Sequence, residues 1–292
     1  MSGSAGAGET TAAPLAILAG GGAFPRIVAE AARAAGRPVA IAAIRGEVDP
    51  GYEAFPHRVV GRGQLGTVLR FFRAAGAREL VIVGGMRERR LPRLSEIDLG
   101  AIWVILRHLR ILRHGDDGLL RKIARIFESR GLRIVGAAEV APHLVVRHGA
   151  LGAYRPGSSA LADIAVGVAE ARAHGARDLG QGVIVVDGVV VAREGPSGTD
   201  AMLAAHAASR APGSLPRGVL VKCPKPTQDR RLDMPAIGSA TVAAAAAAGL
   251  AGIAVEAEGT LVADADAVAR AADAAGIFVW GFDPAEPGRG GA

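Results

Sequence analysis

Residues 15–25 read Leu15-Ala-Ile-Leu-Ala-Gly-Gly-Gly-Ala-Phe-Pro25, and they begin the pattern that decides the fold. Five apolar residues predict a buried strand, and a helical pattern then runs to about Ala35. A proline suits the first helical turn. The three glycines between strand and helix let backbone amides approach a phosphate or a sugar. This strand, glycine loop and helix predict the first unit of a doubly wound fold.

The same order of helix, glycine and apolar strand recurs along the chain. Glycine just past a helix end adopts the left-handed conformation at little cost. The recurring glycines and the strands that follow them are Gly36 with Val39–Ile44, Gly76 with Leu80–Val83, Gly131 with Leu132–Val135, Gly249 with Gly252–Val255, and Gly276 with Ile277–Trp280. Alternating helices and continuous apolar strands are typical of parallel sheets covered on both faces. The predicted fold class is therefore α/β.

The length of 292 residues suggests two domains, at about 150 residues each. We expect a Rossmann-like, doubly wound N-terminal domain and a C-terminal α/β catalytic domain, joined by a linker rich in glycine and proline. The predicted ranges are 1–13 for a disordered extension, 14–147 for the N-terminal domain, 148–159 for the linker, 160–283 for the C-terminal domain and 284–292 for a disordered tail.

The composition limits the kinds of ligand and the cellular environment that we expect for this protein. The net charge of +6 is carried by arginine, which favours anionic ligands or an anionic membrane surface. Nucleic acid is not expected, because the basic residues are scattered and not interleaved with aromatic residues. A single cysteine, Cys223, excludes an internal disulfide and fits a reducing cytoplasm. Its position between apolar and proline residues favours inert packing over a nucleophilic role.

Two segments bear on localisation. Residues 1–13 lack the basic and apolar regions of a signal peptide. Residues 234–255 carry no charge, but they contain a proline and three glycines and are mostly alanine. We interpret them as loop, buried helix and strand, and not as a membrane span. The expected protein is cytoplasmic.

The glycine loop does not match a dinucleotide fingerprint completely. Gly20 and Gly22 fit, but Phe24-Pro25-Arg26 replaces the final glycine. The second strand ends in Arg45-Gly46-Glu47, where no clear acidic residue is expected for a ribose hydroxyl. Nucleotide binding in general is better supported than NAD. A plain tight turn is the structural alternative.

A second glycine-rich strand end follows Leu80–Val83. Ligands of open α/β sheets bind at the carboxyl ends of strands, so both glycine segments are expected to face one crevice. The residues assigned to substrate binding there are Gly20, Gly21, Gly22, Phe24, Gly84, Gly85 and Arg87.

A helix is predicted from about Ser95 to Arg113, with an apolar stripe that includes Leu99, Ile102 and Trp103. The stripe is either core-facing, or a surface for acyl chains or a membrane. Asp116 and Asp117 follow, and each is either a helix N-cap or a substrate-binding residue.

The C-terminal domain begins with a helix at Ala160–His174 and a hairpin that turns on Asp187-Gly188. Gln181, before the hairpin, is assigned to substrate binding. Residues 194–200 read Glu-Gly-Pro-Ser-Gly-Thr-Asp and start another helix. Thr199 and Asp200 are either a cap or a helix N-terminus aimed at an anion, and we favour a shared role. Thr199 is assigned as catalytic and Asp200 as substrate-binding.

The segment from Lys222 to Gly238 is the most unusual in the chain. It holds two of only three lysines, together with two arginines, a glutamine and two aspartates. Such cations suit a phosphate-rich substrate, and the aspartates suit a divalent metal. The assigned residues are Lys225, Asp229 and Asp233 as catalytic, Lys222, Gln228, Arg230 and Arg231 as substrate-binding, and Asp229 and Asp233 as metal ligands. A solvated polar loop is the alternative.

These motifs together resemble the LpxI-type UDP-2,3-diacylglucosamine pyrophosphatases of lipid A biosynthesis. The residues that carry the resemblance are Leu18–Pro25, Gly84-Gly85, Gly115–Leu120, Glu194–Asp200 and the pattern Lys222-x-Pro-Lys-Pro-x-Gln-Asp-x-Arg-x-Asp-x-Pro-x-Ile-Gly238. The similarity spans about residues 14–283.

The resemblance implies Mg²⁺-dependent hydrolysis of the diphosphate of UDP-2,3-diacylglucosamine, giving UMP and 2,3-diacylglucosamine 1-phosphate. Asp233, with or without Asp229, would anchor the metal or orient water. Lys222, Lys225 and one of the two arginines would neutralise charge on the phosphoryl oxygens. Thr199 would hold the water or a phosphate. A homodimer and a peripheral contact with the inner membrane are further implications.

Two other functions remain open at this stage. The glycine loop is compatible with an NAD(P)-dependent oxidoreductase, which predicts tight dinucleotide binding. A non-catalytic nucleotide-sugar or lipid-binding module predicts binding without turnover.

Overall fold

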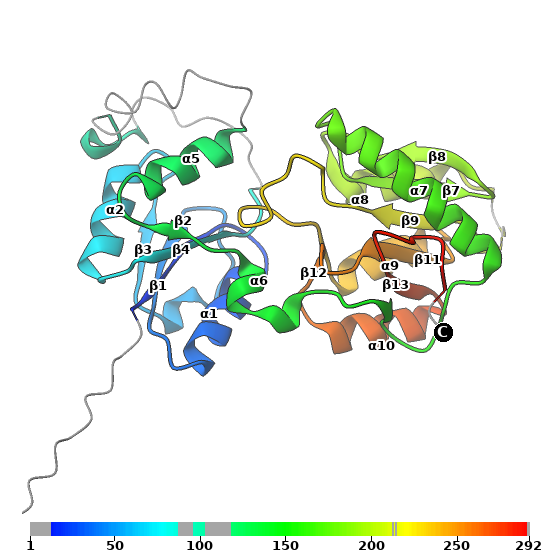
Figure 1. Cartoon of the computed structure of the whole chain (residues 1–292), viewed down its shortest axis with the longest axis horizontal. Coiled ribbons are helices and arrows are strands. Elements are labelled where there is room, and N and C mark those ends of the chain that lie inside the picture. The colour runs from blue at the N-terminus through cyan, green and yellow to red at the C-terminus, as the bar shows by residue number, and fades with distance from the viewer. Residues whose placement is uncertain (1–12, 87–95, 103–117, 212, 214, 291–292) are drawn as a thin grey trace, which may run out of the picture. The chain divides into compact units, whose positions relative to one another are not determined.

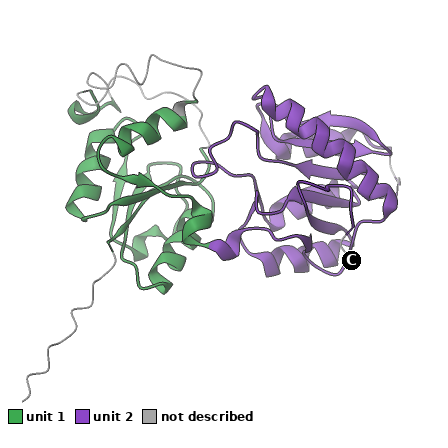
Figure 2. Cartoon of the chain, in the orientation of Figure 1, with its two compact units in different colours: residues 1–141 green, residues 142–292 purple. Residues whose placement is uncertain are grey.

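The computed structural model describes residues 13–86, 96–102, 118–211, 213 and 215–290 (Figure 1). The chain divides into two compact units, residues 1–141 and 142–292 (Figure 2). The segment predicted as a linker contains strand β6 (Gly149–Ala150), which pairs with β13 (Phe278–Phe282) of the second unit. Apart from Ala13, the predicted N-terminal extension lies outside the described residues.

Unit 1 holds a five-stranded parallel sheet in the order β3-β2-β1-β4-β5. Its described elements are β1 (Leu15–Ala19), α1 (Phe24–Ala34), β2 (Val39–Ile44), η1 (Tyr52–Ala54), β3 (His57–Val60), α2 (Leu65–Ala74), β4 (Glu79–Val83), α5 (Leu119–Glu128), β5 (Arg133–Ile134) and α6 (Ala137–Val140). Consecutive residues of β1 are fully buried, as expected for a strand covered on both faces. The predicted Rossmann-like fold is confirmed.

The strand order of unit 1 reverses between β1 and β4, which is the topological switch point of a doubly wound sheet. The two glycine-rich strand ends pack backbone against backbone there. Gly21 and Gly85 exchange two N–H···O hydrogen bonds of 2.8 and 2.9 Å. A Cβ atom on Gly20 would lie 2.5 Å from the Gly85 carbonyl oxygen, and one on Gly84 would lie 2.7 Å from the Gly20 carbonyl carbon. Glycine is therefore required at both positions.

Unit 2 holds a mixed six-stranded sheet in the order β6-β13-β11-β9-β7-β8 and a two-stranded sheet, β10-β12. Its other elements are η3 (Pro142–Leu144), α7 (Ser158–Ala176), β7 (Gly182–Val186), β8 (Val189–Arg193), α8 (Gly198–Ser209), β9 (Val219–Lys222), β10 (Ala236–Ile237), α9 (Ser239–Ala247), β11 (Gly252–Glu256), β12 (Leu261–Val262) and α10 (Ala265–Ala275). Strands β9, β11 and β13 are parallel, while β7, β8 and β6 run antiparallel to their neighbours.

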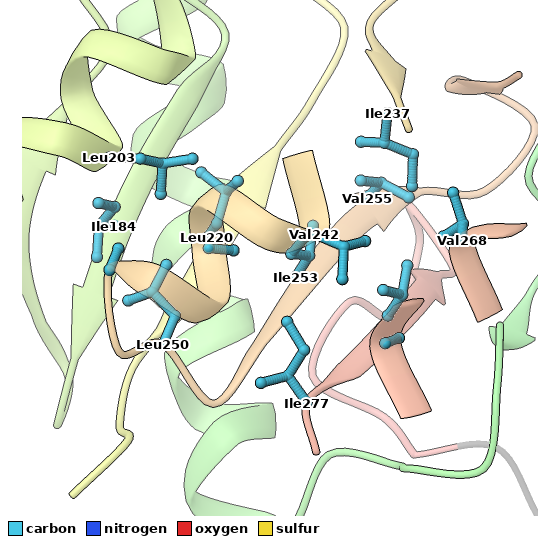
Figure 3. Close-up of a cluster of buried hydrophobic side chains, with 14 of the residues drawn as sticks. Ile184, Leu203, Leu220, Ile237, Val242, Leu250, Ile253, Val255, Val268 and Ile277 are labelled. Atoms are coloured by element: carbon cyan, nitrogen blue, oxygen red, sulfur yellow. The ribbon is translucent and has the colours of Figure 1, made fainter. Parts of the chain in front are cut away.

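The sheet of unit 2 is covered on both faces by apolar side chains. One core cluster joins Leu220 and Ile253 of the sheet to residues of α8, α9 and α10 such as Val242 (Figure 3). The other joins Val221 and Trp280 to α7. Neighbouring residues of a strand pack on opposite faces of the sheet, because side chains alternate along a strand. This unit has the C-terminal α/β fold expected from the sequence.

The structure tests the predictions made for the hairpin turn at Asp187 and for residues 234–255. Asp187 and Gly188 both have positive φ, 51° and 77°, so the hairpin turn has the predicted type I′ character. Residues 234–255 form β10, α9 and β11. Within the described part of the chain, no helix has the length and apolarity needed to cross a membrane. Most of the helix predicted at 95–113 lies outside the described residues.

Replacing Gly84 by alanine is expected to destabilise unit 1. Its φ of 105° is unfavourable for residues other than glycine, and the added Cβ would collide with the Gly20 backbone. The expected loss is about 1–3 kcal/mol of unfolding free energy. Gly85→Ala is the matched control, because nothing lies within 4 Å of its added Cβ. Thermal melting followed by circular dichroism tests this, and equal midpoints for the two variants would contradict it.

Candidate active site

The hairpin of β7 and β8 and the ends of β9 and β11 meet at one edge of the unit 2 sheet. Strand β9 ends there at Lys222, and the parallel strand β11 ends at Glu256. Strand β7 is antiparallel to β9 and begins there, with Gly182 opposite Lys222. Strand β8 ends opposite Val183, so Glu194 follows at the same edge. The sheet register therefore brings Gln181, Glu194, Lys222 and Glu256 to a common edge.

Lys222 is a buried ammonium group, only 5% exposed. Its one described hydrogen bond, 3.4 Å long, goes to the Ala236 carbonyl oxygen. Burial lowers the pKa of Lys222, and the negative charges of Glu194, Asp200 and Asp233 oppose this shift. The predicted phosphate-binding lysine is thus subject to the negative charge of three carboxylates.

Thr199 lies in the first turn of α8, which follows a tight turn at Gly195–Gly198. Its hydroxyl donates a hydrogen bond of 2.9 Å to Oε2 of Glu194. The backbone of Glu194 is fixed on both sides, because its N–H donates to the Gly182 carbonyl oxygen and its own carbonyl accepts from Nε2 of the buried His174. Sequence reasoning assigned Thr199 but missed Glu194, since only the folded turn brings them together.

Asp233 is presented by the loop that follows β9. The backbone N–H of Lys225 donates to Oε1 of Gln228, and Nε2 of Gln228 donates to Oδ2 of Asp233 at 2.6 Å. The ammonium group of Lys225 pairs with the exposed Asp178 at 2.6 Å. Gln228 therefore links Lys225 and Asp233, two of the residues predicted to be catalytic, and the Asp233 side chain remains exposed to solvent.

The two arginines of this loop both pair with carboxylates of their own chain. Arg231 forms a fork to Asp229 through Nε and Nη2, at 3.1 and 2.7 Å. Arg230 donates to Oε1 of the buried Glu256 at 2.7 Å, and Arg172 of α7 donates to Oε2 of the same carboxylate at 3.3 Å. Glu256 thus ties the loop to the sheet edge, a role that sequence reasoning missed. Substrate binding by either arginine stays a prediction.

Three further assigned residues can be placed in unit 2. Gln181 is half-buried before β7, and its Oε1 is a buried acceptor that has no hydrogen-bond partner among the described residues. Asp200 is exposed in the first turn of α8. Burial raises the pKa of the Cys223 thiol to about 12, so this cysteine packs as a neutral side chain and is not a nucleophile.

The glycine loop of unit 1 uses its amides within the chain. Gly20 donates to the Val83 carbonyl oxygen, Gly21 to that of Gly85, and Gly22 to Oδ2 of Asp49 at 2.6 Å. Asp49, which follows the turn after β2, therefore contacts the glycine loop, and the expectation that no clear acidic residue awaits a ribose hydroxyl there stays a prediction. Asp49 was missed because a turn separates it from the strand. A ligand that binds the Gly22 amide would have to displace Asp49.

The remaining residues that the sequence predicted to bind substrate lie in unit 1 or outside the described residues. Phe24 is half-buried at the start of α1, and Gly84 and Gly85 lie at the end of β4. Arg87, Asp116 and Asp117 lie outside the described residues. In the described ranges, no group of three or more His, Cys, Asp or Glu side chains has the arrangement of a metal site.

The fold and this sheet edge define a two-domain α/β protein whose lysine, threonine and carboxylates suit a phosphate-containing ligand. The particular family follows from comparison with known proteins. A family model described as the LpxI N-terminal domain matches residues 14–144, and one described as the LpxI C-terminal domain matches residues 147–280. The chain belongs to the LpxI family, which confirms the resemblance noted in its motifs.

One relative carries a curated name. The chain is 40% identical over 283 residues to a protein of Caulobacter vibrioides named UDP-2,3-diacylglucosamine pyrophosphatase LpxI. The similarity covers 93% of this chain and 98% of that protein. The two proteins are therefore similar over nearly their whole lengths.

The ion pairs of the buried Glu256 carboxylate are expected to stabilise unit 2, whereas the pair at the exposed Asp178 is not. Glu256→Gln keeps the shape but removes the charge between two arginines, with an expected loss of about 1–3 kcal/mol. Asp178→Asn is the control: its side chain is 84% exposed, and exposed pairs contribute about 0–1 kcal/mol. Urea unfolding measures both variants. A larger loss for Asp178→Asn would refute this ranking.

Proposed function

We propose that this protein hydrolyses the diphosphate of UDP-2,3-diacylglucosamine to UMP and 2,3-diacylglucosamine 1-phosphate, a step of lipid A biosynthesis. The observation that carries the proposal is the buried Lys222 at a sheet edge where Glu194 accepts a hydrogen bond from the Thr199 hydroxyl, in a chain similar over 93% of its length to a pyrophosphatase of that name. The enzyme would be a hydrolase of phosphorus anhydrides.

The cations and hydroxyl of the site have distinct tasks in this reaction. Lys222 cannot move far, because its strand is paired on both sides. It would therefore present a fixed positive charge to the charge that grows on the phosphoryl oxygens. Lys225 lies on a loop and would exchange Asp178 for a substrate phosphate. Thr199 would hold the attacking water, since its hydroxyl oxygen retains lone pairs after donating to Glu194.

Dependence on Mg²⁺ is part of the proposal. Three carboxylates, those of Glu194, Asp200 and Asp233, act electrostatically on the Lys222 ammonium group. An anionic diphosphate would be repelled unless a cation joined it. Bound Mg²⁺ would neutralise phosphate oxygens, and it is usually held by one or two carboxylates together with such oxygens. The exposed Asp233 fits this task. Asp229 fits less well, because it would first have to release Arg231.

Membrane association and oligomerisation are further proposals. The described part of the apolar stripe, Leu99 and Ile102, is 85% and 44% exposed. This exposure favours the acyl-chain or membrane interpretation over the core-facing one. We therefore propose a cytoplasmic enzyme that contacts the inner membrane peripherally and acts on a two-chain lipid. A homodimer is proposed on the family resemblance alone.

The decisive experiment offers the purified chain UDP-2,3-diacylglucosamine with Mg²⁺ or with EDTA and measures UMP. Release of UMP that requires Mg²⁺ is expected. Binding without turnover would favour a nucleotide-sugar or lipid-binding module. Micromolar binding of NADH, followed by fluorescence, would favour the oxidoreductase alternative.

Asp233→Ala is expected to lower the turnover number by about a hundredfold or more, because a carboxylate that anchors metal or water acts mainly on the transition state. The protein should stay folded, since the side chain is exposed and its loss opens no cavity. Initial rates at matched Mg²⁺, with circular dichroism, provide the measurement. Asp266→Ala, an exposed carboxylate on α10, is the control and should keep the parent rate. Near-parent turnover by Asp233→Ala would remove this loop from the mechanism.

A further inference from the structure

Three structural properties of Glu194 have no role in the proposed hydrolysis so far. It is half-buried at the sheet edge, and its backbone is held by hydrogen bonds on both sides. Its carboxylate accepts a hydrogen bond from the Thr199 hydroxyl, with 2.9 Å between the two oxygen atoms. A carboxylate placed in this way can take a proton as well as accept a hydrogen bond.

The space around the carboxylate shows that its position is specific. A Cβ atom on Gly182 would lie 2.7 Å from Oε2 of Glu194 and 3.7 Å from Cγ of Lys222. The absence of a side chain on Gly182 therefore makes room for Glu194 next to Lys222. Because Oε2 also accepts from Thr199, the lysine, the carboxylate and the hydroxyl share one small region.

The direction of the Thr199 hydrogen bond decides what this hydroxyl can do. Its only proton points to Glu194, so toward any other group Thr199 Oγ1 can act only as an acceptor. A water molecule that donates to Thr199 would keep a lone pair free for attack on phosphorus. The hydroxyl is thus suited to accept a proton from water, provided that it can pass on its own.

We propose that Glu194 is the positioning residue of the site, orienting the Thr199 hydroxyl and taking its proton as Thr199 accepts one from the attacking water. This inference rests on the proposed hydrolysis. In the step, the water oxygen forms a bond to phosphorus and the P–O bond to the bridging oxygen breaks. The bridging oxygen leaves with the electron pair as part of the departing phosphate. Glu194 then releases its proton to solvent.

Substitutions of Glu194 and Thr199 test the proposal through the separation of kcat from KM. Glu194→Gln keeps an acceptor for the hydroxyl but lacks a carboxylate that can be protonated. Its kcat should fall by about a hundredfold or more, as expected for the loss of a proton acceptor, with KM changed by less than about threefold. Thr199→Val should cause a similar loss. The double variant should be no worse than about threefold below either single variant, because the two residues act as a unit.

Gly182→Ala tests the same idea with both functional side chains present. The added methyl group would push against the flexible end of Glu194 and separate it from Thr199. We expect a loss of kcat comparable to that of Glu194→Gln, with the fold intact. Gly157→Ala is the control, because nothing lies within 4 Å of its added Cβ, and it should keep the parent kcat.

The possible outcomes separate this inference from the proposed function. If the parent chain releases no UMP, the hydrolysis and the role of Glu194 both fail. If the parent is active and folded Glu194→Gln keeps kcat within about threefold, only the role of Glu194 fails. Losses that add in the double variant would also overturn it, since they would mean that Glu194 and Thr199 act separately. If Glu194→Gln does not fold, Gly182→Ala with parent activity overturns the proposal.

Discussion

The burial of the Lys222 ammonium group at the end of β9 is the interaction on which the rest of the site depends. A buried cation is costly unless negative charge compensates it, and here Glu194 and Asp200 of the segment that leads into α8, and Asp233 of the loop after β9, supply that charge. The lysine and its carboxylates therefore stabilise one another's positions. A divalent cation that accompanied an anionic substrate would offset its repulsion from these carboxylates.

Ion pairs within the chain organise the segment after β9. Glu256 holds Arg230, and Gln228 links Lys225 to Asp233. These contacts fix the loop before any ligand arrives, which reduces the ordering that binding must supply. Under the proposed function, Lys225 would exchange its exposed partner, Asp178, for a substrate phosphate at little cost. A pair with a buried carboxylate, such as that of Glu256, is thus suited to position the loop, whereas the pair with the exposed Asp178 is suited to exchange.

Glycines permit close approach in both units, but for different reasons. In unit 1, Gly20 and Gly84 allow two strand ends to pack backbone against backbone at the switch point. In unit 2, Gly182 leaves room for a carboxylate beside Lys222. The glycine pattern in the sequence indicates where such contacts occur, whereas it does not distinguish a backbone contact from a side-chain contact.

The sequence by itself determined the α/β class, the Rossmann-like first unit, the hairpin at Asp187 and the LpxI family, because these depend on local periodicity and on contiguous motifs. It also singled out Lys222, Thr199 and Asp233. Only the tertiary structure brought in Glu194, Glu256 and Asp49, and it showed that Arg230 pairs within the chain. Those contacts depend on strand register and on the path of turns. Residues far apart in the chain, or separated by a turn, carry no local signal that they will meet.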